Sequence, residues 1–477
     1  MPWSAVAIPE ARATLLVPMR LRRPTASELV LSLLCLMYLI TYVDRVNIAT
    51  AASEIRRELA LTNTQLAFIL SAFGYPYVVF QIFGGWVGDR VGPRRTLFLC
   101  GLIWASATIL TGFAGSLTAL FLVRVMIGVG EGATFPVATR AMQAWTPPSR
   151  RGFAQGLTHA FARLGNALTP PLVAWLIALA TWRGSFVVLG CLSLVWVMAW
   201  VWYFRDVPSE HPSITPAELE PLPNGGRRAS GRPAAIPWRQ LAGRMWPVSV
   251  VYFCYGWTLW MYLNWLPSYF LHEHKLQLGR SALFSSAVFA AGVGGDYLGG
   301  VLSDAILRRT GDLRIARCRL VRLAFLASLV CVLPIFVTHD LTVIVISLAA
   351  AFFFAEIVIG PMWAIPMDIA PRYSGTASGF MNTGSALAAV LSPLAFGFII
   401  DATGNWNLPF IGSVGLLLAG ALLASTMHPE RPFEADGGSD GGQTGVRPGS
   451  QLGRTSARHV SSIARAKNNR FRTSFEV

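Results

Sequence analysis

Residues 84–95 read GGWVGDRVGPRR, and the spacing of glycine, acid and arginine in this stretch decides how the rest of the chain is interpreted. The pattern is carried by Gly85, Asp89, Arg90, Gly92, Arg94 and Arg95. Glycine at position 85 lets a neighbouring helix approach closely, glycine at position 92 permits a tight turn, and Asp89 can meet a helix N-terminus or a basic partner. An ordinary basic loop would explain the arginines alone but not this spacing. We therefore expect a structured connection between two closely packed helices.

The segments on both sides of this connection are strongly apolar. Of the 477 residues, 53% are hydrophobic and 13% are charged, whereas soluble domains carry roughly 25% charged residues. The mean hydropathy is +0.50, and a membrane-spanning helix needs about 20 mostly apolar residues. Runs of that kind lie at 27–51, 65–88, 95–114, 117–142, 152–180, 184–204, 245–271, 281–303, 319–338, 341–367, 374–400 and 407–427. The pattern predicts an all-α membrane protein with twelve transmembrane helices in two six-helix halves.

Segments rich in proline, glycine and charge divide the chain. Residues 205–243 cannot bury enough apolar surface to fold alone. We interpret them as a cytoplasmic linker between an N-terminal half at 27–204 and a C-terminal half at 244–427. Residues 1–26 are expected to form a cytoplasmic N-terminal segment, and residues 428–477 a disordered basic cytoplasmic tail.

The net charge of +15 comes largely from arginines in alternate connections between the apolar runs. Arginine and lysine accumulate on the cytoplasmic side of membrane proteins, so both termini are expected in the cytoplasm. The basic residues come with no nucleic-acid-binding motif, the six cysteines have no metal-ligand spacing, and no phosphate-binding loop for ATP is present. We therefore expect no nucleic acid, metal or cofactor as a partner, and no enzymatic activity.

Two charged residues interrupt the first apolar run, which reads LITYVDRVNIA around Asp44 and Arg45. Charges inside a spanning helix are costly, and they usually pair with one another or face a cavity. The alternative is that they mark the outer end of the span, where long side chains reach water easily. Ile48, Ala49, Ala51 and Ala52 continue the apolar pattern beyond them, which favours a functional role.

The fourth run carries a second pair, Arg124 and Glu131, seven residues apart. Seven residues are nearly two helical turns, so both side chains are expected on one face, about 10 Å apart along the axis. Buried ion pairs contribute little to stability unless they are well matched. We therefore interpret this face as part of a functional cavity.

The second half contains a partial copy of the opening pattern. Residues 299–311, GGVLSDAILRRTG, repeat its positions at Gly300, Asp304, Arg308 and Arg309. The stretch at 84–95 strongly resembles the signature loop between the second and third helices of the major facilitator superfamily. This resemblance implies the major facilitator fold, in which two equivalent halves rock about a central cavity. Both loops would then be gating elements rather than substrate sites.

Further motifs narrow the resemblance. They are the Asp-Arg pair of the first span, R-x6-E in the fourth, TWRGSF at 181–186, NWLPSYF at 264–270, and MWAIPMDIAP with SGFMN within 362–382. Together they resemble the anion:cation symporter branch, which includes bacterial galactonate, glucarate, hexuronate and phthalate transporters and animal sialic-acid and glutamate carriers. The similarity extends over nearly all of residues 27–427.

The branch implies roles for the matching positions. Asp44 and Glu131 would be the proton-coupling carboxylates, while Arg45 and Arg124 would attract a substrate carboxylate. The resemblance also places four uncharged residues in the substrate site, namely Tyr42, Tyr77, Trp363 and Asn382.

The fifth span departs from the galactonate carriers, which have a glutamine near the stretch where this sequence has Ala162 and Arg163. A third cation in the cavity would favour a dianionic or aromatic acid, which makes Arg163 a candidate substrate-binding residue. Glu356 of the tenth span is its candidate partner across the halves. His159, four residues earlier, is either a satisfied core residue or a proton carrier.

These features predict a secondary active transporter in the bacterial inner membrane that moves a small organic anion with protons by alternating access. The substrate would be a sugar acid, a hexuronate or an aromatic or dicarboxylic acid, the other partners would be protons and the lipid bilayer, and we expect a monomer. A proton-antiport exporter of drugs or metabolites is one alternative, which would favour an acidic, aromatic cavity over arginines. A ligand-sensing transceptor or scaffold is another, which would tolerate loss of Asp44 or Glu131.

Overall fold

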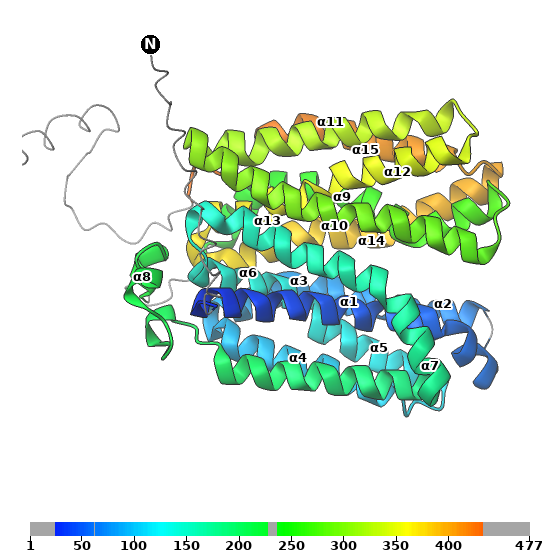
Figure 1. Cartoon of the computed structure of the whole chain (residues 1–477), viewed down its shortest axis with the longest axis horizontal. Helices are drawn as coiled ribbons and strands as arrows, with labels where there is room; N and C mark the ends of the chain where they lie inside the picture. The colour runs from blue at the N-terminus through cyan, green and yellow to red at the C-terminus, as the bar shows by residue number, and fades with distance from the viewer. Residues whose placement is uncertain (1–23, 62, 228–235, 433–477) are drawn as a thin grey trace, which may run out of the picture. The chain divides into compact units, whose positions relative to one another are not determined.

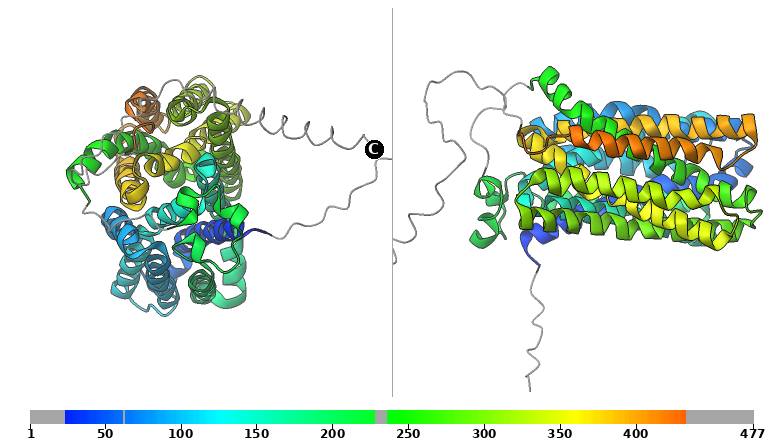
Figure 2. Two further views of the ribbon diagram at one scale, coloured as in Figure 1. Left: turned by 90° about the vertical axis from the view of Figure 1, so that its left-hand side faces the viewer. Right: turned by 90° about the horizontal axis from the view of Figure 1, so that it is seen from above.

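The computed structural model describes residues 24–61, 63–227 and 236–432, all within one compact unit. Across these ranges the chain forms helices and connections but no strand, and the long helices lie side by side (Figures 1 and 2). The expected N-terminal segment up to residue 23 and the expected basic tail from residue 433 lie outside the described residues.

The first helix begins at a capping box, as its sequence allows. The Thr25 side chain accepts a hydrogen bond from the Glu28 backbone N–H at 3.2 Å, and the Glu28 carboxylate accepts one from the Thr25 N–H at 2.8 Å. The helices of the first half are α1 (Ala26–Glu58), α2 (Asn63–Ala72), α3 (Gly74–Val91), α4 (Pro93–Thr111), α5 (Leu117–Gly132), α6 (Thr134–Trp145) and α7 (Arg151–Tyr203). The long α7 comprises two of the predicted membrane spans. They are separated where its backbone leaves helical geometry at Ala180 and Thr181.

The two halves are joined by a linker with short helical turns, including α8 (Pro216–Leu219). The second half consists of α9 (Trp238–His272), α10 (Leu278–Thr310), a π-helical turn (Arg314–Arg319) leading into α11 (Leu320–Val332), α12 (Leu341–Glu356), α13 (Ile359–Ile369), α14 (Ser374–Thr403) and α15 (Leu408–Leu423).

Eight helical stretches of the described chain are long and apolar enough to cross a membrane. One of them, Pro148–Tyr203, contains the break in α7 and so accounts for two of the predicted spans. The remaining three predicted spans correspond to α4, α9 and α10, which are more polar. The first turn of α4 carries Arg94 and Arg95, and α10 carries Asp296 and Asp304. Each of the twelve predicted spans therefore has a helical counterpart.

The opening motif connects α3 to α4 at the end of the bundle where α1 begins and the linker lies, which we call the linker end. Asp89 accepts hydrogen bonds from the backbone N–H groups of Gly375 at 3.0 Å and Thr376 at 2.7 Å, both in the first turn of α14. Arg140 lies 3.5 Å from the same carboxylate. A Cβ at Gly85 would collide with the Gly375 carbonyl oxygen. Asp89 thus meets both a helix N-terminus and a basic partner, and it joins the two halves.

The remaining motif residues shape the same connection. Gly92 has a φ of 97°, which glycine adopts without strain, and Arg94 donates from its backbone N–H to Asp206 at 2.8 Å. The Arg90 guanidinium lies 5.4 Å from the centre of the Trp86 ring, and Arg95 is exposed. Gly92 and Arg94 therefore fix the turn between α3 and α4.

The partial copy of the motif makes an equivalent contact in the opposite direction. Asp304 of α10 accepts hydrogen bonds from the N–H groups of Gly152 at 3.0 Å and Phe153 at 2.6 Å, in the first turn of α7. Arg317 lies 3.1 Å from Asp304 and also 3.1 Å from Asp368, which in turn binds Arg151 at 2.8 Å. Each half therefore caps a helix of the other half at the linker end.

Candidate functional site

A small cavity of about 20 Å³ lies between the two halves, where both contribute residues. Its volume suffices for about one water molecule. From the first half it is lined by Tyr42, Arg45, Tyr77, Phe135, His159 and Arg163, and from the second half by Tyr252, Leu259, Trp260, Trp363, Asn382, Ser385 and Ala386. The structure therefore brings together six of the predicted substrate residues, whereas Asp44, Arg124 and Glu131 lie outside the lining.

Arg45 forms an ion pair with Glu131, which is completely buried. The guanidinium also lies near three aromatic rings of the cavity wall, with centroid distances of 4.7 Å to Tyr77, 5.0 Å to Tyr42 and 5.0 Å to Phe135. Such rings attract a cation through their negative faces. Its Nη2 atom has no hydrogen-bond partner in the described part of the chain. Arg45 is thus held by one carboxylate and keeps a free donor beside the cavity.

Asp44 points away from the cavity, although it precedes Arg45 in the chain. Successive residues of an α-helix lie about 100° apart, so the two side chains leave α1 in different directions. Asp44 accepts a hydrogen bond from the Ser193 hydroxyl at 2.9 Å, and its Oδ1 has no partner among residues 24–61, 63–227 and 236–432. The sequence leaves open whether Asp44 and Arg45 pair with one another or face a cavity. In the structure Arg45 pairs with Glu131 and lines the cavity, whereas Asp44 meets Ser193.

Arg124 is buried near the Phe73 ring, 5.2 Å from its centroid. Its Nε and Nη1 atoms make no hydrogen bond to the described residues. The seven-residue spacing predicts Arg124 and Glu131 on one face of the helix, and the ion-pair partner of Glu131 is Arg45 on α1. Arg124 is consequently a buried cation that has no ion-pair partner among the described residues.

Arg163 also lines the cavity and joins the two halves. Its Nη2 atom lies 3.2 Å from the Glu356 carboxylate and donates to the Tyr255 hydroxyl at 3.0 Å, and Tyr255 donates in turn to Glu356 at 2.8 Å. Its Nη1 atom donates to the Tyr42 hydroxyl at 3.4 Å. Its Nε atom lies 3.7 Å from a carboxylate oxygen of Asp296. The predicted partner Glu356 is present, together with a second acid.

Sequence reasoning missed Asp296 and Gln81. Asp296 is a completely buried carboxylate in the middle of the eighth span, and that position alone could have identified it. Gln81 accepts a hydrogen bond from Asn382 at 2.8 Å, which again links the halves. A neutral glutamine in an apolar span gives a weaker signal. Over the described ranges, no group of three or more acidic, histidine or cysteine side chains is arranged to hold a metal ion.

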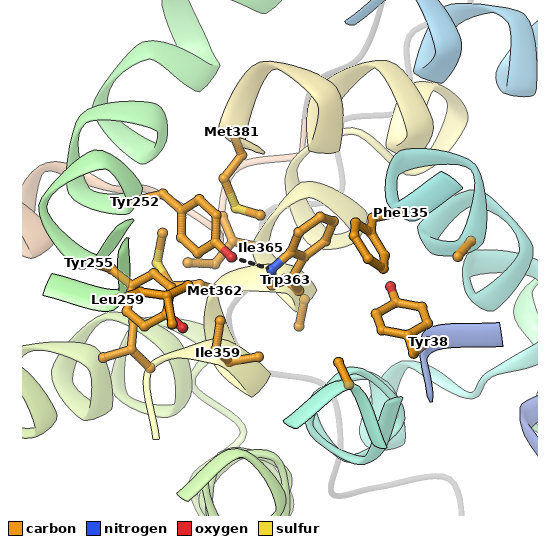
Figure 3. Packing of buried hydrophobic residues seen from close by; sticks show 14 of the residues in the cluster. Tyr38, Phe135, Tyr252, Tyr255, Leu259, Ile359, Met362, Trp363, Ile365 and Met381 are labelled. Carbon is orange, nitrogen blue, oxygen red and sulfur yellow. Dashed lines mark hydrogen bonds between the residues drawn. The ribbon is translucent and has the colours of Figure 1, made fainter. Parts of the chain in front are cut away.

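Aromatic side chains from both halves meet, as Figure 3 shows, and Phe135, Tyr252 and Trp363 among them line the cavity. Trp363 donates its indole N–H to the Tyr252 hydroxyl at 2.7 Å, and its ring meets that of Phe135 with centroids 6.4 Å apart. His159 packs between Tyr38 and Trp363, and its Nδ1 lies 2.9 Å from the Gln155 carbonyl oxygen. His159 therefore has a backbone partner inside an aromatic layer.

Comparisons with known proteins agree with this architecture. The family model described as the Major Facilitator Superfamily matches residues 34–393 and 309–471. The chain belongs to this superfamily. It is 47% identical over 411 residues to the probable sulfoacetate transporter of Cupriavidus necator, covering 86% of this chain and 95% of that relative.

Other relatives of this superfamily member place it in the anion:cation symporter-like branch. It is 30% identical to the D-galactonate transporter of Escherichia coli O6:H1, covering 84% of this chain and 96% of the relative. It is 28% identical to the probable galactarate/D-glucarate transporter of E. coli K12, covering 81% and 90%. The protein is thus an integral membrane transporter and not an enzyme.

Solved structures agree on the fold. The transporter FucP in its outward conformation matches with a TM-score of 0.66 at 14% identity, covering 84% of this chain and 99% of that chain. The human organic anion transporter MFSD10 matches with a TM-score of 0.65 at 16% identity, covering 83% and 99%. The fold is therefore the all-α major facilitator fold with twelve transmembrane helices in two halves.

Proposed function

We propose that this transporter carries a small organic anion together with protons, by alternating access. The observation that carries this proposal is the Arg45–Glu131 ion pair at the edge of the cavity. While Glu131 is ionised, it neutralises Arg45, and an anion has little to gain by approaching. A proton on Glu131 releases the guanidinium, which then offers charge-assisted hydrogen bonds to a carboxylate or sulfonate. Binding of the anion and of the proton are therefore linked.

Asp44 is the second proposed proton carrier. It is buried against Ser193 in the same half as Glu131, and one of its oxygens has no partner within the residues described. A buried carboxylate without a cation favours its neutral form. Asp44 would exchange its proton when a conformational change opens that part of the first half to water.

The names of the relatives suggest the class of substrate. The relative at 47% identity is named for sulfoacetate, and the more distant ones for galactonate and galactarate or glucarate. Sulfoacetate is short and doubly charged, which suits a cavity with several nearby guanidinium groups. We propose that the substrate is a small organic anion, either sulfoacetate or a sugar acid. The dianionic sulfoacetate is the first substrate to test.

Alternating access is supported by the contacts at the linker end. Asp89 caps α14 and Asp304 caps α7, so both contacts must break before that end can open. The cavity has room for about one water. Uptake therefore requires a state in which the halves are further apart at one end or the other.

The proposed location is the bacterial inner membrane with both termini in the cytoplasm. Arg90, Arg94, Arg95, Arg140, Arg150, Arg151, Arg308, Arg309, Arg314, Arg319 and Arg372 lie in or next to connections at the linker end. The connections at the opposite end contain far fewer basic residues, with Arg183 and Lys275 as examples. By the positive-inside rule the linker end faces the cytoplasm. We propose a monomer as the transport unit.

The test is uptake into proteoliposomes that contain the purified full-length protein. The panel comprises sulfoacetate, galactonate, glucarate, a hexuronate, an aromatic acid and a dicarboxylate, each with and without an inward proton gradient. We expect gradient-driven accumulation of at least one of these anions. Uptake that ignores the proton gradient for every anion, or no uptake of any of them, would contradict the proposal.

A further inference from the structure

Two buried acids form a cluster where α10 meets the end of α12, apart from the Arg45–Glu131 pair. Asp296 and Glu356 are both completely buried there. Cβ atoms at Gly292 and Gly295 of α10 would approach the Glu356 side chain to 3.2 Å and 3.0 Å. Glycine at these positions lets α10 pack closely against Glu356 at the end of α12.

The charges of this cluster do not balance. Arg163 lies 3.2 Å from Glu356 but 3.7 Å from Asp296, which exceeds a normal hydrogen bond. Both Asp296 oxygens and Glu356 Oε1 have no hydrogen-bond partner among the residues that the structure describes. Two carboxylates beside one guanidinium leave one uncompensated negative charge in a buried site, which is costly. One proton on Asp296 would remove that charge.

No second cation among the described residues around the cluster balances the extra negative charge. The titratable and charged side chains around this cluster are Arg163 and His159 of α7, Tyr252 and Tyr255 of α9, and Tyr42 of α1. The helix on the other side of α12, α11, packs against it through the uncharged Ser328, which donates to the Ala351 carbonyl oxygen at 2.8 Å. Within the described chain, Arg163 is therefore the cation on which both acids depend.

We propose that Asp296 and Glu356 form a second proton-binding site, which holds one proton while Arg163 is engaged and takes up another when Arg163 withdraws. Arg163 belongs to α7 in the first half, whereas both acids belong to the second half. Any movement that separates α7 from α10 and α12 removes the cation from the acids. Glu356 then needs a proton of its own, because an isolated buried carboxylate is unstable. The proton count of this site thus follows the contact between the halves.

Infrared spectroscopy of the purified full-length protein in lipid tests this site without any substrate. The readout is the C=O stretch of protonated carboxylic acids at neutral pH, taken as the difference between wild type and each variant. Asp296→Asn and Glu356→Gln each leave one acid with one guanidinium, so both should lose one acid band. In Arg163→Gln the band of protonated carboxylic acids should be stronger than in wild type, because both acids must then be neutral. Asp340→Asn is the matched control, since Asp340 caps α12 at the opposite end and asparagine caps equally well.

An acid band that is the same in wild type and Asp296→Asn would overturn the inference. So would failure of both single variants to fold while the Asp340→Asn control folds, because each variant reproduces the charge of the protonated cluster. This readout is independent of the proposed function. If the protein transports none of the anions but gives the expected spectra, only the proposed anion symport is refuted. If it transports an anion but the spectra of the variants do not change, only the second proton-binding site is refuted.

Discussion

Arg45 and Arg163 line the same cavity, but their partners lie in different parts of the molecule. Arg45 binds Glu131 of its own half, and the aromatic rings around it come from that half as well. Arg163 is held by Glu356 and Tyr255 of the opposite half, with Asp296 nearby. A rocking motion of two rigid halves would preserve the first pair and break the second.

This difference separates two tasks, whereas the sequence alone made Arg45, Arg124 and Arg163 candidates for substrate binding only. A pair inside one half can exchange its carboxylate for a substrate in any conformation, which suits binding. A pair between halves changes with the conformation, which suits control of opening. The following substitutions test this division, and they are ordered by the size of the expected effect.

The largest effect is expected for Asp44→Asn. Asparagine retains the contact with Ser193 but carries no exchangeable proton, so gradient-driven accumulation should be lost while some substrate exchange continues. Accumulation and counterflow in proteoliposomes measure the two activities separately. The matched control is Asp401→Asn, an exposed acid near the end of α14. A variant that concentrates substrate as well as wild type would remove Asp44 from the coupling path.

Arg45→Gln should weaken anion binding by about 30-fold or more, which corresponds to about 2 kcal/mol or more. The physical reason is that an anion in a low-dielectric cavity loses its charge-assisted partner. Equilibrium binding of the transported anion measures the change. Arg57→Gln is the control, because Arg57 is exposed and pairs with Glu54 within α1. Unchanged affinity in Arg45→Gln would show that Arg45 is not a substrate residue.

Arg124→Gln provides a companion measurement. Arg124 has unpaired nitrogens near Phe73 but does not line the cavity in this conformation. A similar loss of affinity would mean that the substrate reaches this cation in another state. If affinity does not change, the binding role of Arg124 is wrong.

Arg163→Ala should reduce uptake about tenfold, consistent with the loss of a buried charged contact of about 1.5 kcal/mol or more. If Arg163 acts through the opposite half, monoanions and dianions should suffer equally, and adding Glu356→Gln should restore part of the rate. The control is Arg150→Ala, an exposed arginine just before α7. If Arg163→Ala reduces the uptake of dianions alone, and Glu356→Gln does not restore it, Arg163 contacts the substrate. The proposed difference in role between Arg45 and Arg163 would then be wrong.

The smallest effect is expected for Asn382→Ala. It removes the hydrogen bond to Gln81 between the halves, worth about 1 kcal/mol, so the transport rate should change by roughly fivefold. Gln81→Ala should have the same effect, and the double variant should be no worse than either single one. Additive losses in the double variant would mean that the two side chains act separately, with Asn382 contacting the substrate.

Much of the fold follows from local features of the chain. The motif at 84–95 required a close helix approach at Gly85 and a partner for Asp89, and the structure contains both. The weaker copy at Asp304 could be recognised only by its spacing, yet it makes the equivalent contact with α7. Glycine packing and helix capping depend on a few neighbouring residues, which is why the sequence reveals them.

The candidate site was only partly predictable. Charges in apolar spans stand out, because burying a charge is costly whatever its partner, so Asp44, Arg45, Glu131 and Arg163 could be identified at once. Asp296 has the same property and could have been found by the same rule. The direction in which each side chain leaves its helix, and the helix it meets there, do not appear in a periodic pattern.

The sequence by itself therefore determined the number of spans, the division into halves and the identity of most buried charges. Only the tertiary structure decided the pairs. Arg45 meets Glu131 across 86 positions and Arg163 meets Glu356 across 193 positions of the chain, while Asp44 turns from its neighbour toward Ser193. Hydropathy is a property of each segment in lipid, whereas an ion pair depends on how two distant helices are rotated and spaced. That rotation is a product of the packing of all the helices together.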